Sequence, residues 1–130
     1  MNTSATQRHA GFTLMELMVV MAIIATLLTL ALPRYFHSVD RSREAVLRQD
    51  LHIMRDAIDK FLADRGRYPA SLDELAERRY LRKVPPDPIT DNASTWIVVA
   101  PPDTETQEGV YDVRSGAPGK SLDGEAYESW

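Results

Sequence analysis

The sequence predicts an α+β fold, in which one long N-terminal helix, membrane-spanning in its first half, packs on a small antiparallel β-sheet. Residues 17–32 are sixteen positions without a charge, close to the length that a helix needs to cross a bilayer. Apolar residues then recur every three or four positions as far as Leu62, the pattern of an amphipathic helix. Two short β-rich segments follow later in the chain.

The apolar half of the helix is expected over residues 12–32, which would span roughly 31 Å at about 1.5 Å per residue. Glu16 is the one charged side chain in this stretch. A carboxylate inside a membrane costs a few kcal/mol unless it is paired, so it is a functional hypothesis by default. Cleavage after Gly11 would leave an α-amino group on Phe12, and this ammonium could neutralise Glu16 of a neighbouring copy.

An ordinary secretory signal fits this pattern less well. Its apolar core is shorter, about 7 to 15 residues, and its cleavage site follows that core, whereas Gly11 precedes the apolar run. A plain signal anchor with an incidental Glu16 stays open as an alternative. Charges do not decide the orientation, because Arg8 precedes the run and three arginines follow it within residues 34–43.

The helix is expected to continue beyond the apolar run with a kink at Pro33, whose ring removes a backbone donor and crowds the preceding turn. An apolar stripe in the second half should pack on the sheet. The stripe consists of Phe36, Val39, Val46, Leu47, Leu51, Met54, Ile58, Phe61 and Leu62. Gly66 should end the helix in the left-handed conformation, and the Tyr68-Pro69 pair prevents its resumption.

A second, short helix is predicted from Ser71 to about Arg79. Ser71 and Glu74 fit a capping box, in which each side chain accepts a hydrogen bond from the backbone N–H of the other residue. Residues 84–88 then form a rigid, proline-rich connector.

Residues 95–99 and 109–114 are expected to pair as antiparallel strands across the polar loop 101–108. Because a two-stranded hairpin is marginal alone, its apolar face should lie on the helical stripe and share one core with it. Residues 115–130 are expected to be loop, held at the end by Trp130.

Composition limits the classes of function. The formal net charge is −4, and phosphate binding needs a basic surface, so nucleic acid is not an expected partner. About one hundred residues follow the membrane segment, enough for one small domain. The sequence has no cysteine, so the fold must hold without the disulfides that small exported domains often use.

The run Gly11-Phe12-Thr13-Leu14-Met15-Glu16 before an apolar helix resembles the processing site of type IV pilins and type II secretion pseudopilins. The resemblance implies a pilin-like fold with a leader (1–11), a transmembrane and filament-core helix half (12–33) and a periplasmic globular domain (34–130). It also implies that a prepilin peptidase cuts after Gly11 and methylates Phe12, and that Glu16 directs assembly.

The segments after the long helix resemble the major pseudopilins of type II secretion, on Arg67-Tyr68-Pro69, on the connector 81–88 and on the acidic tail ending in Trp130. The resemblance implies a structural subunit of a pseudopilus in the bacterial inner membrane, with itself, other pseudopilins and the inner-membrane assembly platform as partners. Such a filament drives protein export across the outer membrane. A type IV pilin for adhesion, motility or DNA uptake stays open, as does a monomeric membrane-anchored binding module.

Major pseudopilins also carry a calcium-binding tail, and the positions that match its paired acids are Asp123 and Glu125. Calcium takes six to eight oxygen ligands, so two carboxylates on a tail more often belong to a solvated surface. No enzyme is expected, because the chain offers no cysteine, no phosphate-binding glycine loop after a strand, and histidines only at 9, 37 and 52.

Overall fold

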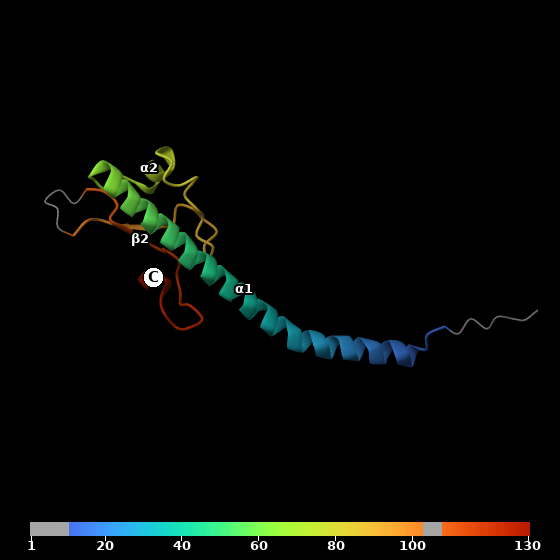
Figure 1. Cartoon of the computed structure of the whole chain (residues 1–130). Helices are drawn as coiled ribbons and strands as arrows, with labels where there is room; N and C mark the ends of the chain where they lie inside the picture. Colours follow the sequence, from blue (N-terminus) through green and yellow to red (C-terminus); the bar gives the residue numbers. More distant parts are fainter. Residues whose placement is uncertain (1–10, 103–107) are drawn as a thin grey trace, which may run out of the picture. The chain divides into compact units, whose positions relative to one another are not determined.

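The computed structural model of the chain describes residues 11–102 and 108–130. In chain order the elements are α1 (Leu14–Arg65), α2 (Leu72–Glu77), β1 (Ile97–Val99), β2 (Asp112–Arg114) and the 3-10 helix η1 (Tyr127–Ser129) (Figure 1). The chain divides into two compact units, one ending at His37 and one beginning at Ser38, and α1 contributes to both. The predicted α+β fold is confirmed.

Helix α1 is 52 residues long and ends where the sequence predicts. Gly66 follows it with φ of +70°, a conformation that costs glycine little because it has no Cβ. The Gly66 N–H still donates to the carbonyl of Leu62 at 2.8 Å, which closes the last turn. Pro33 lies inside α1, and the kink expected there remains a prediction.

The core of the second unit forms around one face of α1. Leu47, Met54 and Phe61 are fully buried in it. Val46 was expected in the same stripe but is 49% exposed, because a neighbour of Leu47 is turned about 100° around the helix axis. Phe36 is also exposed. The complete core consists of Leu47, Leu51, Met54, Ala57, Ile58, Phe61, Leu72, Leu75, Leu81, Trp96, Val110, Val113, Ala117 and Tyr127.

Strands β1 and β2 pair antiparallel, with Val98 opposite Val113. The pairing is as predicted, but each strand is only three residues long. Val113 and Trp96, which immediately precedes β1, are buried in the same core as the α1 stripe, as expected. The indole N–H of Trp96 donates to the carbonyl of Pro85 at 2.7 Å, which ties the connector to the sheet. Residues 103–107 of the predicted polar loop lie outside the described residues.

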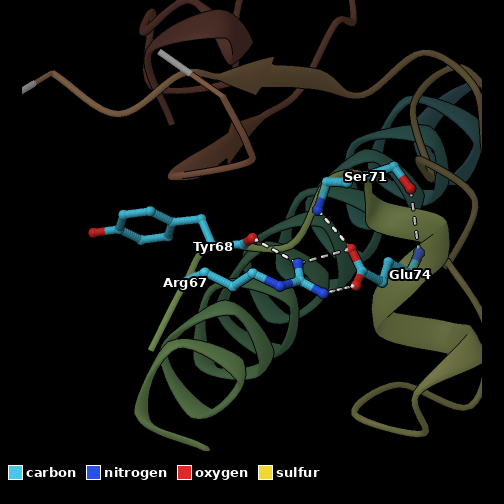
Figure 2. Close-up of polar contacts among 5 residues, drawn as sticks. Arg67, Tyr68, Ser71 and Glu74 are labelled. Carbon is cyan, nitrogen blue, oxygen red and sulfur yellow. Dashed lines mark hydrogen bonds and ion pairs between the residues drawn. The ribbon is translucent and has the colours of Figure 1, made fainter. Parts of the chain in front are cut away.

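Helix α2 begins with a different capping arrangement from the one predicted (Figure 2). The Ser71 hydroxyl accepts from the Glu74 N–H at 3.3 Å, as expected. The Glu74 carboxylate, however, accepts from the N–H of Ala70 at 2.7 Å and from Arg67 at 2.6 Å, not from Ser71. The Arg67 hydrogen bond, followed by that of Ala70, lowers the pKa of Glu74 to about 2. The helix ends at Glu77, two residues early, because Arg79 has a left-handed φ of 65°.

The connector after α2 is fixed by a fully buried carboxylate, Asp87. Its two oxygens accept from the Ile89 N–H at 2.8 Å and from the Ser115 hydroxyl at 2.6 Å. The chain after Ser115 passes so close to Thr95 that a Cβ on Gly116 would lie 2.0 Å from the Thr95 carbonyl oxygen. The Ser115 bond holds the chain after β2 against the connector, and a glycine is required where this chain passes Thr95.

Shortening Leu51 tests the importance of the stripe. Leu51→Ala should lower the free energy of unfolding by about 2–5 kcal/mol, because it leaves a cavity in the core. The matched control is Val46→Ala on the exposed side of α1, expected to change stability by less than about 0.5 kcal/mol. Thermal or denaturant unfolding of the full chain in detergent measures both. Equal losses in the two variants would contradict the assignment of the buried face.

The carboxylate of Asp50 on α1 supplies a pH test. Burial first, and repulsion from Asp87 second, raise its pKa above the ordinary value of 3.8. The folded state therefore favours the neutral acid. This preference adds to the free energy of unfolding below pH 3.8, and the added stability is lost as the pH rises through the folded-state pKa. Asp50→Asn should raise the Tm at neutral pH and lose this advantage in acid. Asp59→Asn, at an exposed position of the same helix, is the control, and an equal rise there would contradict the prediction.

Candidate functional site: the N-terminal motif and the apolar half of α1

Gly11 and Phe12 form an open stretch of chain before α1. Phe12 is 92% exposed, and an added Cβ on Gly11 would meet nothing within 4 Å. An uncovered backbone is one that a peptidase can reach. Among the described residues, the predicted cleavage position is therefore accessible.

Glu16 lies in the first turn of α1 and makes a contact that the sequence analysis did not assign. Its Oε2 accepts from the Thr13 N–H at 3.3 Å, while its own N–H donates to the Thr13 hydroxyl at 3.2 Å. This is a reciprocal capping box, and its Thr-x-x-Glu signal is visible in the sequence. Negative charge is also favourable at a helix N-terminus. The carboxylate is thus partly satisfied within its own chain, through one of its two oxygens.

The following four to five turns of α1 are apolar on every side. In this single chain their large side chains are between 45% and 72% exposed, and the most apolar 18-residue window has a mean hydropathy of 2.4. These side chains belong to Leu17, Met18, Val19, Val20, Met21, Ile23, Ile24, Leu27, Leu28, Leu30 and Leu32. The helix is long and apolar enough to cross a membrane, and such a surface requires lipid or protein to cover it.

Two threonines interrupt the apolar surface without adding an unsatisfied polar group. The Thr26 hydroxyl donates to the carbonyl of Ala22, and the Thr29 hydroxyl to that of Ala25, both at 2.8 Å. In hydrocarbon an unpaired hydroxyl would be costly, so these bonds make both residues compatible with a bilayer. Glu16 is left as the one ionisable side chain of the stretch.

The candidate calcium residues Asp123 and Glu125 lie far along the chain, and both are exposed. Within residues 11–102 and 108–130, no group of three acidic, histidine or cysteine side chains is placed to hold a metal ion. His37 and His52 are exposed positions on α1.

A model of the prokaryotic N-terminal methylation motif matches residues 6–32, which include Gly11, Phe12 and Glu16. The chain is 28% identical to the type II secretion system core protein G of Escherichia coli (strain K12), over 88% of this chain and 85% of that protein. It is 30% identical to the core protein G of Klebsiella pneumoniae, over 63% of this chain and 70% of that protein. The chain belongs to the type II secretion system core protein G family.

The predicted major pseudopilin is thereby confirmed, and the chain is a pseudopilus subunit with a pilin-like fold. The type IV major pilin protein PilA of Myxococcus xanthus is 34% identical, but over 52% of this chain and 31% of that pilin. The core protein G matches extend further along their relatives, so they carry more weight than the pilin match. No solved structure matches the chain.

Proposed function

We propose that this subunit is held in the bacterial inner membrane by α1, with residues 34–130 in the periplasm, and assembles with copies of itself and other pseudopilins into a periplasmic filament. The filament would drive protein export across the outer membrane, with the inner-membrane assembly platform as its partner. The observation that carries the proposal is the uncovered apolar half of α1 with a single carboxylate in its first turn. Packing these helices side by side would cover both features.

Processing would precede assembly. A prepilin peptidase would cut after Gly11 and methylate the new N-terminus at Phe12. The open backbone at these residues supports the step, as does the match to a methylation motif. The free amine would then lie at the head of an apolar helix, where an unpaired charge is expensive.

Glu16 of one copy would receive the Phe12 amine of the next. The capping bond to Thr13 uses Oε2, and within the described residues Oε1 accepts no hydrogen bond, which leaves an oxygen for the incoming ammonium. An ion pair in a low-dielectric setting is penalised heavily if one partner is missing. The pair would therefore select the register in which every amine finds a carboxylate.

A type IV pilin is the weaker alternative, and its support is the partial match to PilA. Loss of protein export after gene deletion supports the secretion filament, and loss of surface pili with intact export supports the pilus. A monomeric membrane-anchored module would need neither the cleavage position nor Glu16.

Processing is tested by substitution at Gly11. Gly11→Leu should abolish cleavage and leave a precursor longer by the leader, because the peptidase must approach the backbone closely there. An added Cβ meets none of the described residues within 4 Å, so a loss of cleavage would not reflect a clash with the fold. Mass spectrometry of the purified chain measures the N-terminus. Thr3→Leu, outside the matched motif, is the control and should be cleaved. An N-terminus other than Phe12 in the unaltered chain would refute the site.

The assembly role of Glu16 is tested with three variants that separate its charge from its capping bond. Glu16→Gln keeps a capping acceptor but removes the charge, and it should be inserted and cleaved yet fail to assemble in register. Glu16→Leu should behave likewise, and Glu16→Lys should be worse because it places two positive charges together. The measurement is crosslinking between cysteines introduced beside Phe12 and Glu16 on different copies.

Thr13→Ala is the matched control for these variants, since it removes the hydroxyl that accepts from the Glu16 N–H but leaves the carboxylate. It should assemble normally. Normal filaments and export from Glu16→Gln would show that the charge does not direct assembly, and the plain membrane-anchor alternative would then be preferred.

A further inference from the structure

The family resemblance places calcium in the tail segment (Ser121–Trp130), but the donors there do not suit it. Asp123 and Glu125 are exposed, and the turn they lie in is closed by main-chain bonds. Ser121 N–H donates to the Glu125 carbonyl at 2.7 Å, and Gly124 N–H donates to the Ser121 carbonyl at 3.0 Å. The Ser121 hydroxyl also accepts from the Glu125 N–H. Two main-chain carbonyls and the one hydroxyl of this turn therefore already accept hydrogen bonds, and two carboxylates fall short of six to eight ligands.

A carboxylate on α1 contacts the tail segment instead. Glu44 is only 8% exposed, although the charged residues near it along α1 are exposed. Its Oε1 accepts from the Leu122 N–H at 2.7 Å and from the Tyr127 hydroxyl at 3.0 Å. Both donors come from the tail segment, about eighty positions further along the chain. Hydrogen bonds to an ionised acceptor are stronger than neutral ones.

Two arginines on the same helix complete the contact with the end of the tail segment. Arg55 donates to the main-chain oxygen of Trp130 at 2.6 Å and to the carbonyl of Val113 in β2 at 3.0 Å. The guanidinium of Arg48 lies 3.9 Å from the centre of the Trp130 ring, a cation–π distance. The tail segment is therefore held at its beginning, middle and end by side chains one or two turns apart on α1.

We infer that Glu44 fixes the tail segment to α1 by accepting the Leu122 N–H and the Tyr127 hydroxyl, so that the seating of this segment does not depend on a divalent cation. Here an acceptor on the helix binds hydrogen-bond donors in the tail segment. In a calcium site, acidic side chains of the tail would instead bind a cation.

The state of Tyr127 agrees with a donor role. Burial, followed by the hydrogen bond to Glu44, raises its pKa to about 12. The phenol therefore keeps its proton throughout the physiological range and remains able to donate to the carboxylate. A phenolate in the same place would repel Glu44, so the contact is stable only with the proton present.

Hydrogen exchange of the full chain in detergent, followed by mass spectrometry of the peptides covering residues 121–130, tests the inference. In the unaltered chain, exchange of the Leu122 amide should be the same with excess calcium or excess EGTA. Glu44→Ala should speed it by at least about tenfold, because the Leu122 N–H loses its acceptor. Glu44→Gln, which keeps an acceptor without charge, should lie between. Peptides covering Leu47–Phe61 should be unaffected, which separates local release from global unfolding.

The matched control is the double variant Asp123→Asn with Glu125→Gln, which should leave tail exchange unchanged. Faster exchange on adding EGTA, or a loosening in the double variant equal to that of Glu44→Ala, would overturn the inference. If Glu44→Ala does not fold, Tyr127→Phe decides: it removes one donor and should speed tail exchange alone, and unchanged exchange would overturn the inference.

Discussion

The apolar face of α1 from Leu47 to Phe61 is the feature on which the second unit depends. A sheet of two three-residue strands cannot be stable alone. It becomes stable because Trp96 and Val113 pack on the face that α1 already presents. The elements after Gly66 therefore add to an existing surface, and none of them forms a separate core. The same helix is apolar on every side over residues 17–32. Its first half therefore has an apolar surface all round, whereas its second half has one apolar face.

Polar side chains hold the irregular segments of this domain in place, a role that further strands or disulfides have in other small domains. The core is bordered by irregular chain, and such chain needs partners for its backbone groups. Asp87 supplies acceptors to the connector, Glu44 to the tail segment, and Arg55 donates to two main-chain oxygens. Each is buried or half-buried, so its loss would leave an unpaired group away from water. These three residues account for much of how a cysteine-free chain fixes its loops.

The features that the sequence predicted depend on near neighbours along the chain. The end of α1 at Gly66, the Ser71 cap and the hairpin pairing follow from local conformational preference. What it could not predict depends on contacts between distant segments. Nothing near Glu44 shows that a tail almost eighty residues away will bury it, and an aspartate in a proline-rich connector is ordinarily solvated rather than fully buried. At the candidate site the motif was visible, yet the Thr13–Glu16 capping box was missed although its spacing is local.

That capping box changes how the cost of Glu16 should be understood. Before any partner arrives, one carboxylate oxygen already accepts the Thr13 N–H, and the unpaired N–H groups of the first turn favour negative charge. Part of the cost of placing a carboxylate at the edge of a membrane is therefore met within the subunit. In the proposed pairing, a neighbouring amine would have to supply only the remainder, and it would meet a side chain that already accepts a hydrogen bond from Thr13. Pre-organisation of this kind would lower the ordering cost of the proposed contact, and it would do so only in the register in which the amine meets the carboxylate.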